Sequence, residues 1–99
     1  MKENFVVLEL GERRKIPVQF WLDGGKAFTP TDPTWELYKT AGSSETLQSS
    51  GPASADVGTD NRWTLTALIE PDAEGEWKLT YSFGFGEEKI RRSFRIKVV

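Results

Sequence analysis

The sequence predicts a small all-β sandwich, and three stretches of alternating side chains carry that prediction. Residues 62–69, 76–85 and 88–98 each place apolar side chains at nearly every second position, with polar or small side chains between them. A period of two is typical of a β-strand with one face buried and the other in water. Trp63 and Trp77 lie on the apolar faces of the first two stretches. Turn signals recur at intervals of about eight to twelve residues, as in sandwiches and barrels of short strands.

Two further strands are expected near the N-terminus, at residues 5–10 and 15–22. Pro17 lies inside the second strand and cannot donate a backbone hydrogen bond, so its position faces solvent or a bulge. A tight turn follows at residues 23–25, which read Asp-Gly-Gly. The inward side of the second strand is expected to consist of Ile16, Val18, Phe20 and Leu22.

The middle of the chain alternates turns and strands. Residues 29–33 are expected to form a loop, because each of their two prolines disfavours the helical conformation in the residue before it. A strand over residues 34–39 turns Trp35 and Leu37 inward, and a turn follows at 41–44. Residues 45–59 are rich in serine, glycine and alanine, and two short edge strands are expected there, at 46–50 and 53–57.

Three connections complete the prediction. Asp60 and Asn61 form a turn, residues 71–75 link two strong strands, and residues 84–87 form a hairpin. No window supports a helix of about ten residues, and no internal repeat is present. Residues 1–99 are therefore expected to form one mostly antiparallel domain of about seven or eight strands.

Composition limits the partners and the compartment. The net charge of −2 over 99 residues argues against a dedicated nucleic-acid binder, which is usually basic. No apolar run is long enough to span a membrane, and the N-terminus lacks the apolar core of a secretory signal. Synthesis in the cytoplasm is expected, and the sequence assigns no further location.

Enzyme chemistry is not expected. The chain has neither cysteine nor histidine, so the commonest general base and the commonest transition-metal ligand are both missing. Four carboxylates cluster near the 71–75 connection but lack the spacing of a calcium-binding loop, and a solvated acidic turn explains them. We therefore assign no catalytic, cofactor-binding or metal-binding residue. The four carboxylates are Glu70, Asp72, Glu74 and Glu76.

Three aromatic side chains are the first candidates for a binding surface. Trp21, Phe28 and Tyr38 occupy strand or loop positions opposite the expected core. Exposed aromatic rings stack on sugars or anchor protein interfaces. A second packing layer or a covering loop would bury them instead, and the sequence leaves both alternatives open.

Basic side chains of the last strand are the second candidates. They project opposite its apolar face and would suit an acidic partner or nucleic acid. Alternatively, they discourage edge-to-edge pairing of sheets. The net negative charge of the chain favours this second interpretation. Arg92 falls on the apolar face, which indicates a bulge, a strand rim or a contact with a carboxylate. The basic candidates are Lys89, Arg91, Arg95 and Lys97.

The pattern around the penultimate strand resembles that of immunoglobulin-like and fibronectin-III-like domains. Asp72, Gly75, Trp77 and Leu79 resemble that family's entry to this strand, where an acidic residue, a small residue, a tyrosine and a cysteine are common. Trp35 resembles the tryptophan of the family's third strand, and Phe20 or Leu22 takes the place of its first cysteine. The chain departs from the family in lacking both cysteines and the phenol that makes a corner hydrogen bond.

In size and style, as a single domain that begins at its own methionine, the chain also resembles small immunoglobulin-like proteins of tailed bacteriophages and prophages. That resemblance implies a non-catalytic structural or interaction module associated with a virion, which binds a protein partner or self-assembles. A carbohydrate- or ligand-binding module that uses the exposed aromatics is the alternative. Neither a membrane nor nucleic acid is an expected partner, and no cofactor is implied.

Overall fold

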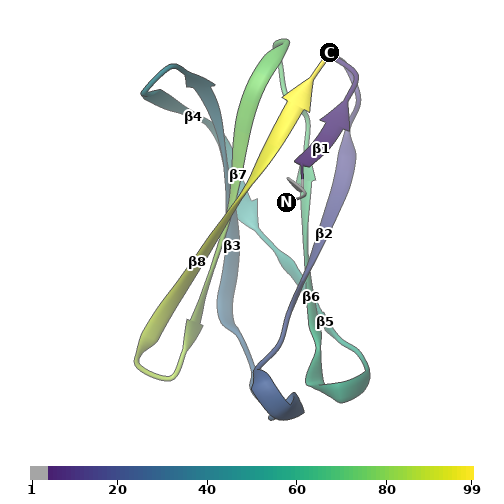
Figure 1. The fold of residues 1–99 in the computed structure, drawn as a ribbon, viewed down its shortest axis with the longest axis vertical. Coiled ribbons are helices and arrows are strands. Elements are labelled where there is room, and N and C mark those ends of the chain that lie inside the picture. The colour runs from purple at the N-terminus through teal and green to yellow at the C-terminus, as the bar shows by residue number, and fades with distance from the viewer. Residues whose placement is uncertain (1–4) are drawn as a thin grey trace.

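A computed structural model describes residues 5–99, which form eight strands in two sheets (Figure 1). A five-stranded sheet has the order β1-β8-β7-β3-β4 and a three-stranded sheet the order β2-β6-β5. Two single-turn 3₁₀ helices, η1 and η2, lie in the connections. The elements are β1 (Phe5–Leu8), β2 (Arg14–Phe20), η1 (Asp23–Gly25), β3 (Thr31–Ala41), β4 (Ser44–Pro52), β5 (Ser54–Val57), η2 (Thr59–Asn61), β6 (Trp63–Ile69), β7 (Gly75–Phe85) and β8 (Glu88–Val98).

The strand order is that of an immunoglobulin-like sandwich. The second, fifth and sixth strands form one sheet, and the third, seventh and eighth form the centre of the other, with β4 added beside β3. Every pairing is antiparallel except that of β1 with β8, which is parallel. This is the division between sheets seen in immunoglobulin domains. The expected fold class is therefore confirmed.

The inward faces are those that the alternation predicts. Leu65, Ala67 and Ile69 of β6 are fully buried, and so are the apolar positions of β7 from Trp77 to Phe83. The Tyr81 hydroxyl donates a hydrogen bond to the backbone carbonyl of Ile16 on the opposite sheet. Among the described residues, every buried side-chain nitrogen or oxygen has a hydrogen-bond partner.

Three tryptophans use their indole N–H groups to fasten connections to the core. Trp35 donates to the Pro52 carbonyl at 3.1 Å, Trp63 to the Phe28 carbonyl at 2.6 Å, and Trp77 to the Ala73 carbonyl at 3.0 Å. The Trp77 bond runs to a carbonyl four residues upstream, as the family's tyrosine does. An indole N–H thus replaces the missing phenol at this corner.

Several strand boundaries differ from the prediction. β1 ends at Leu8, β2 ends at Phe20, and β3 begins at Thr31 inside the expected proline loop. The pairing of β3 with β7 shifts register between Thr31 and Thr34, where Asp32 adopts a φ of 47°. The prolines therefore cause an irregularity within a strand instead of a loop before it.

The two expected edge strands lie in different sheets. β4 is nine residues long and pairs with β3, whereas β5 pairs with β6. Between them Ala53 is buried, and its N–H donates to the Pro33 carbonyl at 2.9 Å. The chain crosses from one sheet to the other at this residue, which the prediction placed inside a strand.

Two polar residues of β7 are buried on the face expected to be wet. Thr80 is 1% exposed and Ser82 is 4% exposed. β7 is the central strand, so each residue has a neighbour on both sides: Thr80 lies between Glu36 and Ser93, and Ser82 lies between Thr34 and Arg91. The Thr80 and Ser93 hydroxyls form a hydrogen bond of 2.9 Å. The alternating pattern correctly placed Thr80 and Ser82 on the outer face of the sheet, but it did not show that neighbouring side chains cover them.

Arg92 lies at a strand rim, one of the three alternatives. The register between β7 and β8 runs without a break from Gly75 to Phe85, so no bulge is present. Its exposed guanidinium donates to the Arg91 carbonyl at 2.8 Å and lies within ion-pair distance of no carboxylate among residues 5–99. No helix among residues 5–99 has the length and apolar character needed to cross a membrane.

Candidate functional site

The best-formed candidate site lies where β2 ends and β6 begins. Phe20 pairs with Trp63, and continuing that antiparallel register sets Trp21 opposite Arg62. The Arg62 guanidinium carbon lies 4.8 Å from the centre of the Trp21 ring, a cation–π arrangement. Trp21 is nevertheless 53% exposed, which matches the expectation for this residue.

The surrounding loops are held together by one side chain. η1 and η2 lie side by side at one end of the sandwich (Figure 1), and the Asn61 amide nitrogen donates to the Gly25 carbonyl at 2.8 Å. Asp60 and Asn61 have φ values of 56° and 54°, and the Arg62 N–H bonds the Thr59 carbonyl at 3.2 Å. These values describe a type I′ turn, the tight hairpin turn that Asn and Asp tolerate.

This loop end, defined by Trp21, η1, η2 and Arg62, encloses an open depression of about 340 Å³. The carboxyl-bearing residues Asp23 and Asp60 line it together with the Trp21 ring. The depression thus offers an aromatic surface, a fixed cation and carboxylates within one small area. Sequence reasoning missed Arg62 and Asn61, although the strand register and the Asp-Asn turn point to both.

The other two aromatic candidates lie elsewhere. Phe28 is half-buried against the core, and its ring packs edge-on against Trp63 and Phe85, so burial, the second of the two alternatives, applies to this residue. Its loop folds back over the open end of the sandwich, which explains the burial. Tyr38 lies half-buried on β3, and the Lys78 ammonium lies 5.0 Å from its ring centre. The three rings do not form one surface.

The basic residues of β8 face outward on the five-stranded sheet, where carboxylates interleave with them. Arg91 pairs with Glu36 at 3.3 Å, and Arg95 lies 3.9 Å from Glu76. All four basic candidates, including Lys89 and Lys97, are exposed. Exposed pairs of this kind contribute little stability, but they make the outer face mixed in charge.

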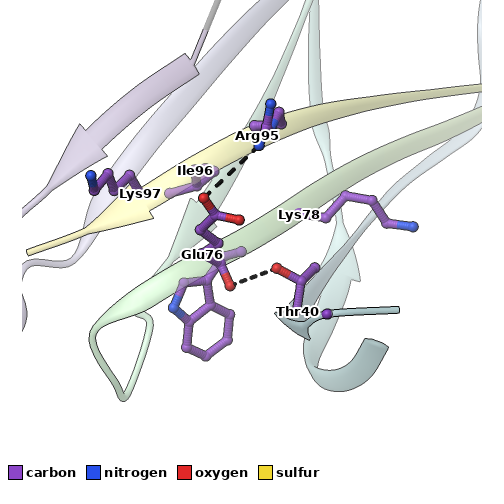
Figure 2. Close-up of a pocket in the computed structure, with 8 residues that line it drawn as sticks. Thr40, Glu76, Lys78, Arg95, Ile96 and Lys97 are labelled. Carbon is purple, nitrogen blue, oxygen red and sulfur yellow. Dashed lines mark hydrogen bonds and ion pairs between the residues drawn. The ribbon is translucent and has the colours of Figure 1, made fainter. Parts of the chain in front are cut away.

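A shallow depression of about 370 Å³ crosses this outer face near the ends of β7 and β8 (Figure 2). Thr40 donates its hydroxyl to the Glu76 backbone carbonyl at 2.9 Å, and Figure 2 shows the Glu76 carboxylate turned toward Arg95. Lys78 points away from Glu76 and pairs with Glu45 at 2.7 Å. The Thr40 hydroxyl, the Glu76 carboxylate and the Lys78 ammonium around this depression are thus each engaged by another protein group.

Two side chains outside both depressions have a shifted pKa. Hydrogen bonds from Arg14 and from the Glu9 backbone N–H lower the pKa of Glu12, and burial raises the pKa of Tyr81 to about 12. Both effects are structural, because the Glu12 carboxylate bonds its own loop and Tyr81 lies in the core. Within residues 5–99, no three carboxylates gather closely enough to hold a metal ion.

Comparison with known proteins adds one structural similarity. No known family and no curated protein matches the chain. The solved structure of the second immunoglobulin domain of the mouse polymeric immunoglobulin receptor is similar, with 14% sequence identity and a TM-score of 0.46. The similarity covers 99% of this chain and 97% of that domain.

Proposed function

We propose that the chain is a non-catalytic interaction module that binds a protein partner at its loop end. The observation that carries the proposal is the exposed Trp21 ring stacked on Arg62, in loops braced by the Asn61–Gly25 hydrogen bond. Tryptophan and arginine are the residue types most enriched among interface residues that dominate binding energy. A braced loop loses little conformational freedom on binding, so less of the interaction energy is spent on ordering it.

Carbohydrate is the second candidate ligand. The exposed indole face and the neighbouring carboxylates Asp23 and Asp60 favour it, because sugars stack on aromatic rings and donate hydroxyl hydrogen bonds to carboxylates. Arg62 lies over the Trp21 ring, however, and reduces the area on which a sugar ring could stack. A protein surface with its own acidic groups suits the exposed cation better.

We further propose that this interaction module is a component of a phage or prophage virion. The small size and single-domain style of the chain support this assignment. A virion component should form a ring-sized oligomer or bind a neighbouring subunit. Molar mass measured by light scattering after size-exclusion chromatography, over a wide concentration range, tests self-assembly directly: a trimer or hexamer supports it, and a strict monomer removes it.

Site-specific photo-crosslinking tests the loop end. A photoreactive amino acid is placed at Trp21, and in a control protein at Leu47, which is equally exposed on β4. We expect discrete cross-linked protein species from position 21 in an extract of the source cells, and none from position 47. Identical products from both positions, or none from position 21, would contradict the proposal. A Trp21-dependent fluorescence change on a glycan panel, without protein cross-links, would favour the carbohydrate alternative.

A further inference from the structure

Among residues 5–99, the outer edge of β8 has no neighbouring strand along more than half its length. β1 pairs with β8 only from Arg95 to Val98, and no other described strand lies beside β8 on that side. Figure 1 shows β8 running well past the short β1 toward the β7–β8 hairpin. Residues 88–94, here called the β8 edge, are therefore open to pairing within the part of the chain that the structure describes.

The hydrogen bonds of Val99 identify which backbone groups face this edge. The Val99 N–H donates to the Leu8 carbonyl at 2.8 Å, and the Val99 carbonyl accepts from the Leu10 N–H at 2.9 Å. Backbone groups alternate sides along a regular strand, and the pairing of β8 with β7 has no bulge. Lys89, Arg91 and Ser93 therefore present their N–H and C=O groups to the open edge.

One of these edge carbonyls is capped by a neighbouring side chain. The Arg92 guanidinium donates to the Arg91 carbonyl at 2.8 Å, which agrees with that carbonyl facing outward. An added strand would place a backbone N–H at this acceptor. The Arg92 side chain thus occupies the acceptor that a partner strand would use. An added strand would release the Arg92 guanidinium, which could then pair with an acidic group of the partner.

The β8 edge is strongly basic in an acidic protein. Residues 88–94 carry three cationic side chains and one carboxylate, whereas the whole chain has a net charge of −2. Arg91 pairs with Glu36, but among the described residues no carboxylate lies within ion-pair distance of Lys89 or Arg92. Lys89 therefore remains available for an acidic ligand on the outer face of β8, beside Arg91, and Arg92 remains available on the opposite face.

A second copy of the chain is a poor occupant for this edge. An antiparallel copy centred on Arg91 and Arg92 would set arginine opposite arginine, and like charges directly opposite destabilise strand pairs. Other edges carry devices that hinder any pairing, such as Pro17 in β2 and the register shift and terminal Pro52 in β4. Residues 88–94 contain no proline and no bulge, so their backbone does not hinder pairing. Their cations repel a basic strand but not an acidic one.

We propose that the β8 edge binds an acidic, extended segment of a partner protein as an added strand. Backbone bonds to Lys89, Arg91 and Ser93 would supply the pairing, as in other cases of strand addition. Carboxylates at alternate positions of the segment share one face and would lie beside Lys89 and Arg91, which share the outer face of β8. The inference rests on the proposed function as an interaction module, but it uses a surface distinct from the loop end.

Peptide titrations test strand addition separately from charge attraction. The probe is a fluorescent peptide of about ten residues that alternates glutamate and valine, followed by anisotropy at low salt. Two control peptides replace every glutamate with glutamine, or replace the central valines with proline while keeping the charge. We expect each control to bind at least about tenfold more weakly. Equal binding of the proline peptide would overturn strand addition, and no binding of the glutamate–valine peptide would overturn the whole proposal.

Variants locate the binding. Lys89→Glu with Arg91→Glu should weaken binding of the glutamate–valine peptide at least about tenfold, because both cations on the outer face of the β8 edge become carboxylates. Arg13→Glu with Lys15→Glu makes the same change of charge at exposed positions outside β8 and should leave binding unchanged. Equal losses in the two double variants would overturn the assignment to the β8 edge.

Two readouts complete the test. Hydrogen exchange should slow at the Lys89, Arg91 and Ser93 amides when the glutamate–valine peptide is added, and unchanged exchange at all three would overturn the proposal. Trp21→Ala should not alter peptide affinity. If peptide binding fails while cross-linking at position 21 succeeds, the β8 edge proposal falls and the interaction module stands; the reverse result removes only the loop end.

Discussion

The Tyr81 hydroxyl on β7 and the Ile16 carbonyl on β2 form a hydrogen bond that joins the two sheets through the core. Both residues are buried, and the Tyr81 ring also packs edge-on against Phe20 and Phe94. A single side chain thus contributes both packing and a polar link between the layers. Removing only the Tyr81 hydroxyl separates the contribution of the hydrogen bond from that of the packing.

Tyr81→Phe keeps the ring and deletes the link. We expect the free energy of unfolding to fall by about 1–3 kcal/mol, because the Ile16 carbonyl loses its side-chain partner in the core. Urea denaturation followed by far-UV circular dichroism measures the change. Tyr38→Phe is the matched control, since Tyr38 makes no hydrogen bond through its hydroxyl among the described residues, and it should change stability little. A similar loss in both variants would contradict the role of the Tyr81–Ile16 bond.

Alkaline pH should destabilise the protein through the same residue. Burial raises the pKa of Tyr81 to about 12 in the folded state, whereas an unfolded tyrosine titrates near pH 10. The folded state therefore binds the proton more tightly, so this contribution is complete below about pH 10 and is lost as the pH rises toward 12. Thermal unfolding measured between pH 8 and pH 12 should show a decline that is shallower in Tyr81→Phe. Identical declines in the two proteins would show that other groups cause the loss.

Replacing a tryptophan with alanine should lower the free energy of unfolding by an amount that depends on how deeply the ring is buried. Trp77 is 2% exposed, and Trp77→Ala should cost about 3–5 kcal/mol, which approaches the total stability of a small domain. Trp63→Ala should fall in or just below that range, because Trp63 is only half-buried. Trp21→Ala should cost less than about 1 kcal/mol, because the ring is largely in water. Denaturant midpoints compare the three variants, and a large loss in Trp21→Ala would show that this ring supports the fold.

Asn61 combines a backbone role and a side-chain role that substitutions can separate. Asn61→Gly keeps the positive φ without strain but loses the hydrogen bond to Gly25, whereas Asn61→Ala loses both. We expect Ala to be about 1 kcal/mol less stable than Gly in urea denaturation. Both variants should reduce cross-linking from position 21, because the brace between η1 and η2 is absent in each. Unchanged cross-linking would show that the loop end does not depend on the brace.

Salt should weaken peptide binding at the β8 edge without weakening the fold. Binding of the acidic peptide at the β8 edge depends on exposed cations, so its dissociation constant should rise several-fold between about 50 mM and 500 mM salt. The stability of the fold should change little over that range, because the ion pairs of the outer face are exposed. Anisotropy titrations and thermal unfolding at each salt concentration measure the two effects. Salt-independent peptide binding would contradict the role of Lys89 and Arg91.

The strands and their inward faces could be predicted from the sequence because alternation is a local property. Leu65, Leu79 and Ile96 are buried on the predicted faces. The candidate site was only partly predictable: Trp21 is exposed as expected, but Phe28 is not, because its loop folds over the end of the core. A sequence of alternating residues says which side chains share a face, and it does not say what covers that face.

The sequence by itself determined the all-β class, the position of nearly every strand and the absence of histidine and cysteine chemistry. The tertiary structure decided which strands share a sheet, the crossing at Ala53, the burial of Thr80 and the pairing of Trp21 with Arg62. Each of these depends on neighbours from distant parts of the chain. The β8 edge has the same origin, since it is defined by the strands that pair with β8 among residues 5–99.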